Sequence, residues 1–244
     1  MLLPVFNEAG NLPPLLEELA AAIRPTGAAV EVIVVDDGST DETATAAARA
    51  GGLPAQVVSH ERNLGLARAI ATGLGAILPQ AADADVVVTM DADNTHPPSL
   101  IPAMLAEIRR GADLVIASRY VPGGLEEGVP PLRRLLSHGV GLLLRVRFGL
   151  RGVRDYSCGY RAYRTGLLRA AAARYGARLI ESRGFTVMAE LLLKLAPFHP
   201  VTVEVPLHLR YDRKQGASKM RLGQTIGGYL GLLLTRLPPQ EKAP

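Results

Sequence analysis

The first 120 residues alternate between short, continuously apolar runs and longer segments with helical periodicity. Five runs are predicted to be strands: 2–6, 32–35, 56–58, 86–90 and 114–117. Four segments are predicted to be helices: 11–23, 40–50, 64–78 and 99–110. Strands that are apolar throughout are typical of a sheet covered on both sides. The alternation therefore predicts an α/β fold, with a mostly parallel, Rossmann-like sheet flanked by helices.

Residues at the predicted helix ends agree with this arrangement. Ser39 and Glu42 have the spacing of a capping box at a helix start. Gly51 and Gly111 stand where glycine commonly ends a helix.

Acidic side chains follow three of the predicted strands. Glu8 follows the first, Asp36 and Asp37 the second, and Asp91 and Asp93 the fourth. In parallel sheets, ligands bind beyond the carboxyl ends of the strands. Because carboxylates gathered at one edge repel each other, the pattern predicts a cation or a ligand with hydrogen-bond donors there.

The sequence Asp91-Ala92-Asp93 is the central chemical signal. Two carboxylates at a turn can approach one Mg²⁺ or Mn²⁺, which prefers oxygen ligands. Such an ion can neutralise a departing nucleotide diphosphate. Because aspartate is also common in ordinary turns, the spacing alone leaves a structural role open.

Two other segments are candidates for nucleotide contacts. Asp36 and Asp37 could accept hydrogen bonds from a ribose or a base, or one could cap a helix while Gly38 makes a tight turn. Phe6 could pack on a base with Glu8 at its edge, or the two could form a hydrophobic anchor and a helix-entry turn.

Beyond residue 120 the alternation ends. A long loop is expected at 122–131, strands at 155–164 and 201–212, and a disordered tail at 236–244. Helices are expected at 132–148, 185–195 and 220–234. The chain is long enough for one large α/β domain, which we expect to span 1–235.

Several ordered motifs resemble family 2 glycosyltransferases of the GT-A fold, and among them the polyprenol-phosphate (dolichol-phosphate) mannose or glucose synthases. The resemblance runs from residue 2 to about residue 222. The segments that carry it are PVFNEAGNLP, VVDDGSTDET, NLGLARAIATG, VVTMDADNTHPPSLI, DLVIASRYVPGG, DYSCGYRAYR, GFTVMAELLLK and EVPLHLRYDRKQGASKM.

The resemblance implies a nucleotide-sugar-binding half at 1–119 and an acceptor-binding half with helices and short strands at 120–235. It implies that nucleotide contacts come from Pro4, Phe6, Glu8, Asp36, Asp37 and Ala92. It places Asp91 and Asp93 at the metal and diphosphate, with Thr95 where relatives often have a glutamine, so that a hydroxyl or water would complete the metal's ligands. It implies catalytic or phosphate contacts from Arg119, Arg133 or Arg134, Arg213, Ser218 and Lys219.

The acceptor is inferred from the need for a base. A sugar hydroxyl needs one, whereas a phosphate acceptor is already anionic near neutral pH. The only candidate is Asp155, which could orient an acceptor or simply begin a strand. The chain has no tryptophan, so it lacks the Q-x-x-R-W motif of processive polysaccharide synthases.

We therefore expect an inverting transfer of mannose or glucose from a nucleotide-diphosphate sugar to a polyprenyl or dolichyl phosphate. A sugar-hydroxyl acceptor is the alternative. A phosphatase of the haloacid-dehalogenase type would also fit the run Asp91–Thr95, but that fold carries the motif on its first strand and not on its fourth.

A lipid acceptor requires contact with a membrane. Residues 132–148 combine leucines with arginines, which suits either a helix lying in the membrane interface or a core-facing helix with solvated arginines. The helix at 220–234 has the same ambiguity and could also dock on a separate membrane-spanning partner.

The weakly basic composition agrees with anionic partners: phosphates, nucleotides or an acidic membrane surface. The net charge is +4 and the pI near 9.4, with no basic, aromatic-studded stripe for nucleic acid. One cysteine, no signal-peptide pattern and no apolar stretch long enough to span a bilayer predict a cytoplasmic protein, peripheral at the cytoplasmic face of the membrane.

Overall fold

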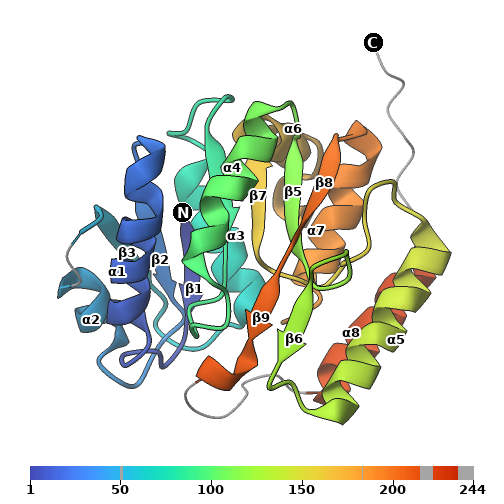
Figure 1. Ribbon diagram of the computed structural model, residues 1–244, viewed down its shortest axis with the longest axis horizontal. Helices are drawn as coiled ribbons and strands as arrows, with labels where there is room; N and C mark the ends of the chain where they lie inside the picture. Colours follow the sequence, from blue (N-terminus) through green and yellow to red (C-terminus); the bar gives the residue numbers. More distant parts are fainter. Residues whose placement is uncertain (50–51, 183, 215–221, 236–244) are drawn as a thin grey trace.

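The computed structural model describes residues 1–49, 52–182, 184–214 and 222–235. A seven-stranded sheet runs through its centre (Figure 1). In spatial order the strands are β3 (Ala55–Ser59), β2 (Val32–Asp36), β1 (Leu2–Val5), β4 (Val86–Thr89), β7 (Arg161–Arg164), β5 (Leu114–Ser118) and β8 (Thr202–Pro206). The predicted α/β fold with a mostly parallel sheet is confirmed.

One strand runs against the others. β7 lies between β4 and β5 and is antiparallel to both, while β1, β2, β3 and β4 are joined by parallel pairs, as are β5 and β8. The acidic turn after β4 and the arginine after β5 therefore lie at the same edge of the sheet, separated by a strand from much later in the chain.

Helices cover both faces of the sheet. The longer ones are α1 (Leu12–Ile23), α2 (Thr43–Arg49), α3 (Leu66–Ile77), α4 (Ile101–Arg109), α5 (Pro131–Phe148), α6 (Thr165–Tyr175), α7 (Val187–Leu195) and α8 (Leu222–Leu234). In Figure 1, α1 and α4 lie in front of the sheet and α3, α6 and α7 lie behind it. The inner strands are buried on both faces, and every residue of β2 and of β5 is buried.

The first half matches the sequence prediction except at one helix start. α2 begins at Thr43, and Ser39 is not its cap. The Ser39 hydroxyl instead donates to the Asp36 carboxylate and accepts the N–H of Asn7. The predicted capping box is wrong because a tight turn closed by Asp36 takes the hydroxyl. Gly111 follows α4 with a φ of +109°, as predicted, and Gly51 lies outside the described residues.

The second half differs more from prediction. A second, two-stranded sheet pairs β6 (Leu125–Glu127) with β9 (His208–Arg210), where only a loop was expected at 122–131. The strand predicted at 155–164 is only β7, because the Asp155 carboxylate accepts the N–H groups of Ser157 and Cys158 and makes a turn. α6 was not predicted.

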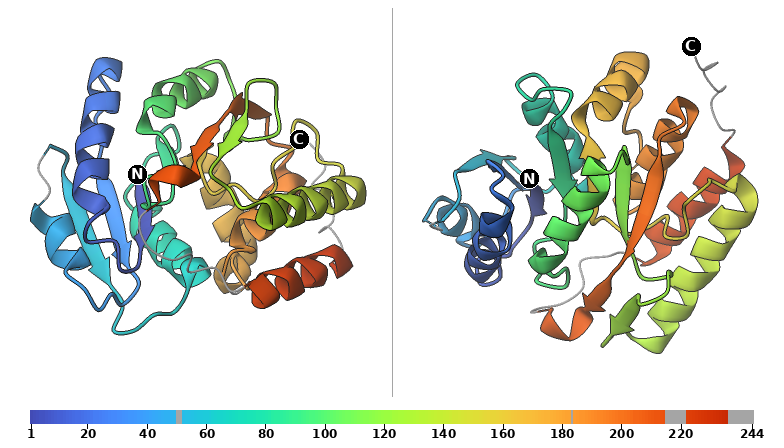
Figure 2. Two further views of the ribbon diagram at one scale, coloured as in Figure 1. Left: turned by 60° about the horizontal axis from the view of Figure 1, so that its bottom comes forward. Right: turned by 45° about the horizontal axis from the view of Figure 1, so that its top comes forward.

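Helices α5 and α8 lie side by side at the end of the molecule beyond β8 and β6 (Figures 1 and 2). The guanidinium of Arg147 on α5 donates to the carbonyls of Leu233 and Thr235 at the end of α8. Within the described part of the chain, no helix combines the length and the apolar character needed to cross a bilayer.

Candidate active site

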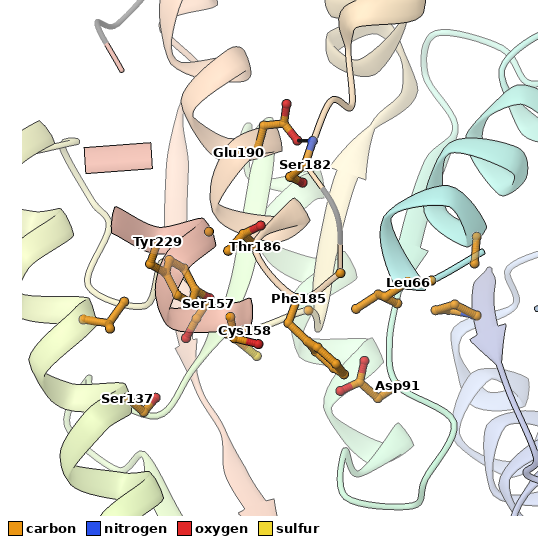
Figure 3. Close-up of a pocket in the computed structure, with 18 of the residues that line it drawn as sticks. Leu66, Asp91, Ser137, Ser157, Cys158, Ser182, Phe185, Thr186, Glu190 and Tyr229 are labelled. Carbon is orange, nitrogen blue, oxygen red and sulfur yellow. Dashed lines mark hydrogen bonds between the residues drawn. The ribbon is translucent and has the colours of Figure 1, made fainter. Parts of the chain in front are cut away.

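A cavity of about 1200 Å³ opens at the carboxyl edge of the sheet. Its walls come from the end of β1, the loop before α3, the turn after β4, helix α5, the start of α7 and helix α8. Figure 3 shows Asp91 and Phe185 on one side and Ser157, Thr186 and Tyr229 on the other. The cavity therefore joins segments from both halves of the chain.

The turn after β4 brings Asp91 and Asp93 into this cavity. Burial raises the pKa of the Asp91 carboxyl, and repulsion from Asp93 acts in the same direction. The Asp91 backbone N–H donates to Nδ1 of His96 at 3.2 Å, and the buried His96 ring stacks on Tyr160. His96 was not predicted as a site residue, although its position three residues after Asp93 places it in the same turn.

Asp93 is balanced by a lysine from far along the chain. The ammonium of Lys214 donates to Oδ2 of Asp93, and the Thr95 hydroxyl donates to Oδ1 at 2.7 Å. Burial would raise the pKa of Asp93, but the charge and hydrogen bond of Lys214, with help from Thr95, lower it. Sequence spacing gave no sign of this ion pair, whose partners lie 121 positions apart.

The donor set at this turn suits a hard divalent cation. Asp91, Asp93 and Thr95 line the cavity there. The ammonium of Lys214 is already paired with Asp93, where a metal cation would bind. The described residues contain no group of three or more His, Cys, Asp or Glu side chains able to hold a metal. Mg²⁺ or Mn²⁺ bound here would take its remaining ligands from water and from a diphosphate, which is how Mg²⁺ is usually held in such sites.

The end of β1 and the turn after β2 form the opposite wall. Pro4, Phe6, Glu8 and Asp37 line the cavity there. The Asp37 carboxylate accepts the N–H groups of Leu64 (2.9 Å) and Gly65 (2.7 Å), and lies 2.7 Å from His60. Asp37 thus fixes the loop that carries Leu64 and Gly65 along the cavity.

Asp36 has a different role from Asp37. It is not among the described residues that line the cavity, and its carboxylate accepts the Ser39 N–H at 3.0 Å to close the turn. Gly38 in this turn has a φ of +72°, and a Cβ there would lie 2.3 Å from the backbone of Arg62. The turn therefore requires glycine for both its conformation and its close approach.

A chain of amides connects the wall at β1 to the acidic turn. Asn11 donates to the Glu8 carboxylate at 2.5 Å, and Asn94 donates to the Asn11 side chain at 3.1 Å. Asn94 directly follows Asp93 and has a φ of +61°. Asn11 and Asn94 were not predicted as site residues, since neither has a charge or a motif of its own.

Arg119 projects into the cavity from the end of β5. Asp155, whose side chain is fully buried, accepts two of its N–H groups at 2.8 Å each, and Ser157 accepts a third at 2.8 Å. Glu126 on β6 accepts a further bond at 3.2 Å. Burial would raise the pKa of Asp155, but Arg119 outweighs it and lowers the pKa. Asp155 is therefore ionised and holds Arg119 in place. It is not among the described residues that line the cavity.

The other predicted phosphate-binding residues are placed unequally. Arg133 lines the cavity and donates to the Tyr211 hydroxyl at 2.8 Å. Arg134 is exposed and bonds to Glu126, and Arg213 is exposed, 3.7 Å from Glu18; neither is among the described lining residues. Ser218 and Lys219 lie outside the described residues.

The remaining wall is mostly apolar and belongs to helices α5 and α8. Leu136 and Val140 come from α5, and Ile226 and Leu232 from α8. Tyr229 of α8 lies close to Ser157 in the cavity wall (Figure 3), and burial raises the pKa of the Tyr229 hydroxyl to about 12. Ser157 accepts a hydrogen bond from Arg119, so helix α8 lies near the residues that hold this arginine.

A family model for glycosyl transferase family 2 matches residues 1–171. The chain belongs to glycosyl transferase family 2. The undecaprenyl-phosphate mannosyltransferase of Micrococcus luteus is 37% identical over 224 residues, which cover 91% of this chain and 87% of that relative. The dolichol-phosphate mannosyltransferase of Pyrococcus furiosus is 33% identical over 232 residues, or 94% of this chain. The match spans only 61% of that relative's length.

Solved structures agree with this membership. Glucosyl-3-phosphoglycerate synthase from Mycobacterium tuberculosis, in complex with Mn²⁺ and UDP-glucose, superposes with a TM-score of 0.67 at 25% identity, covering 94% of this chain and 77% of that one. Its complex with phosphoglyceric acid gives a TM-score of 0.68 at 24% identity, covering 98% and 80%. The GT-A type of fold is thereby confirmed.

The predicted resemblance to polyprenol-phosphate mannose synthases is likewise confirmed by these relatives. This family 2 chain is an enzyme that transfers a glycosyl group. Among the predicted site residues, the cavity brings together Pro4, Phe6, Glu8, Asp37, Asp91, Ala92, Asp93, Thr95, Arg119 and Arg133.

Proposed function

We propose that this glycosyltransferase moves a hexose, mannose or glucose, from a nucleotide-diphosphate sugar to a polyprenyl phosphate, with inversion at the anomeric carbon. The observation that carries the proposal is the set of groups that line one cavity. Pro4, Phe6 and Glu8 line this cavity at the end of β1, Asp91 and Asp93 line it at the acidic turn, and Arg119, Arg133 and an apolar wall of α5 and α8 line the rest. The relatives named for undecaprenyl-phosphate and dolichol-phosphate mannosyl transfer support the same acceptor class.

The donor half is proposed to be 1–119. Pro4, Phe6, Glu8, Asp37 and Ala92 would contact the nucleotide, with Asp36 shaping the turn. Asp91 and Asp93, with Thr95, would hold Mg²⁺ or Mn²⁺. A bound divalent cation would supply positive charge to the departing diphosphate.

The acceptor half is proposed to be 120–235. An oxygen of the acceptor phosphate attacks the anomeric carbon as the bond to the diphosphate breaks, and that electron pair leaves with the nucleotide diphosphate. Because the attacking oxygen is already anionic, no base is needed. Arg119 and Arg133 face this space and would orient the phosphate, since guanidinium groups bind phosphate with paired N–H donors. Arg213, Ser218 and Lys219 are proposed to add contacts to phosphate; Ser218 and Lys219 lie outside the described residues.

The lipid is proposed to reach the cavity from a membrane surface beside α5 and α8. Large apolar side chains on the outside of these helices are exposed: Leu132, Leu135, Leu142, Leu143 and Val146 on α5, and Leu230 and Leu234 on α8. Arginines on α5 stand beside them, as in helices that lie in an anionic interface. We propose peripheral attachment at the cytoplasmic face, with a separate membrane-spanning partner as an alternative support.

The test is a transfer assay with labelled GDP-mannose and UDP-glucose, undecaprenyl phosphate in vesicles, and Mn²⁺ or EDTA. We expect labelled lipid with one donor, none with EDTA, and a loss of about 100-fold or more in the Asp91→Asn variant. Asp83→Asn, which changes an exposed carboxylate paired with Arg169, is the matched control and should retain activity.

The alternatives give different products in the same assay. Label on an added methyl mannoside but not on the lipid would favour a sugar-hydroxyl acceptor. A family 2 chain gives no support to the phosphatase alternative, which predicts release of inorganic phosphate from simple phosphoesters. If no nucleotide sugar is consumed with any acceptor and metal, the proposed function is refuted.

A further inference from the structure

Lys214 occupies the position at Asp93 that a metal ion would need. Its ammonium donates to Oδ2 of Asp93, and both side chains are almost buried, with exposed fractions of 13% and 12%. Thr95 already donates to the other oxygen of Asp93. Asp93, the carboxylate most suited to bind a cation, is therefore already paired with the ammonium group of Lys214.

The segment that carries Lys214 is attached to the acidic turn. The N–H of Arg210, at the end of β9, donates to the carbonyl of Thr95 at 3.0 Å. The next residue, Tyr211, accepts a hydrogen bond from Arg133 at 2.8 Å, and the Lys214 ammonium lies 5.9 Å from its ring centre. These bonds hold the backbone that carries Lys214 in place, so its contact with Asp93 is part of the fold and not a chance surface contact.

The charges at the turn favour only one added cation at a time. Asp91 and Asp93 bring two carboxylates to the turn, and Lys214 is paired with one of them. A divalent ion bound to Asp93 would meet the ammonium at close range in a poorly solvated site, where like charges repel strongly. Either the ion or Lys214 can hold Asp93, but not both.

We propose that Lys214 is an internal cation that stabilises the acidic turn without metal and that must leave Asp93 before a divalent cation can bind. The inference rests on the proposed metal-dependent function and deepens it. On this proposal Lys214 sets the affinity of the site for the metal ion. Tight metal binding then depends on a diphosphate, because the displaced Lys214 ammonium can pair with its negative charge instead of with Asp93.

The test measures Mn²⁺ binding directly, by the loss of the free-ion EPR signal, with and without a nucleoside diphosphate. Lys214→Gln should bind Mn²⁺ about tenfold tighter than the wild type without nucleotide, because the competing charge is gone. The gain should shrink when GDP or UDP is present. Lys214→Arg keeps the charge and should stay near the wild type.

The matched control is Arg109→Gln, an equal loss of charge at the exposed end of α4, which faces the opposite edge of the sheet. It should leave Mn²⁺ affinity unchanged. Mn²⁺ should also raise the melting temperature of Lys214→Gln by more than that of the wild type, since ligands stabilise the state they bind.

The outcomes distinguish a failure of the proposed role of Lys214 from a failure of the proposed transfer reaction. Equal Mn²⁺ affinity in the wild type and Lys214→Gln, with transfer intact, overturns only the role of Lys214. Tighter binding in Lys214→Gln without any transfer supports that role and counts against the proposed reaction. No Mn²⁺ or Mg²⁺ binding in any variant, with or without nucleotide, overturns both.

Discussion

Asp155 fixes the orientation of the Arg119 guanidinium and of its N–H donors. Its buried carboxylate takes two of them, and the turn that carries it is held by Glu204, which accepts the N–H groups of Arg154 and Asp155 at 2.7 Å each. In this arrangement Asp155 acts on an acceptor only through Arg119. Its removal should therefore change both the stability of the fold and the orientation of the arginine.

We expect Asp155→Asn to lower transfer to polyprenyl phosphate about 100-fold, since small misplacements of an orienting group carry penalties of that size. It should also lower the free energy of unfolding by about 3 kcal/mol, because one partner of a buried ion pair is lost. Kinetics and urea unfolding measure the two effects. Glu107→Gln, in an exposed pair with Arg110, should change neither.

The Asp155–Arg119 pair should also make the stability of the fold depend on pH. Because the folded pKa of Asp155 is lowered, its contribution is fully present above the ordinary value of 3.8 and is lost as pH falls through the folded pKa. The wild type should lose more stability than Asp155→Asn on acidification below about pH 4. An identical acid transition in the two proteins would contradict an ionised, arginine-bound Asp155.

At the residue scale, prediction from sequence depended on whether the chemistry was local. Asp91 and Asp93 could be placed because they follow an apolar strand directly. Lys214 and Tyr229 could not, since each reaches the site through tertiary packing from more than 70 positions away from its partner. Asp155 was predicted as a candidate base or strand start, and nothing in the sequence indicates that Arg119 would neutralise it.

At the scale of elements, the docking of α8 depends on a close contact with the start of α7. A Cβ added at Gly228 would lie 2.7 Å from Cγ2 of Thr186, whereas one added at Gly227 would meet nothing within 4 Å. The close approach lets Tyr229 reach Ser157. Glycine at 228 is therefore a packing requirement in a helix that would otherwise favour alanine.

Gly228→Ala should loosen α8 and lower transfer to the lipid acceptor several-fold, while nucleotide binding at the distant wall stays intact. Gly227→Ala is the matched control and should be neutral or more stable by up to about 1 kcal/mol, from helix propensity alone. Melting temperatures and acceptor KM values distinguish the variants. Equal behaviour of the two would show that the α7–α8 contact does not matter for the acceptor.

Elements were predictable where each had its own periodicity, as in the first half. β6 and β9 are three residues each and exist only because they pair with one another. The residues before β7 are apolar enough for a strand, but the carboxylate of Asp155 draws their N–H groups into a turn. The first feature arises from pairing between distant segments and the second from hydrogen bonds of one side chain to nearby backbone, and hydrophobic periodicity records neither.

At the scale of the whole molecule, helices α5 and α8 form one end of the molecule (Figure 2). Their exposed leucines make this end apolar. The cavity opens between these same helices and the sheet. A protein placed with this edge on a bilayer would bring its acceptor site to the lipid headgroups.

We expect the double variant Leu135→Ser with Leu142→Ser to lose about tenfold or more in binding to anionic vesicles, since each leucine removes apolar area from water on insertion. The two residues lie seven positions apart on one face of α5, with exposed fractions of 70% and 59%. Flotation of vesicles with bound protein measures the effect, and the melting temperature should not change. Val201→Ser, at an equally exposed residue before β8, should bind as the wild type does.

The position of β7 has a consequence for how the chain is made. β4 and β5 have no direct pairing and are joined only by a strand that the ribosome adds last among the three. Until Arg161–Arg164 has emerged, the nascent polypeptide carries two apolar strands with open edges, and the acidic turn still lacks Lys214, the partner of Asp93. The proposed donor half would therefore be completed only after the start of the proposed acceptor half has been translated, and we expect a chain that ends before β7 to be an aggregation-prone fragment without activity.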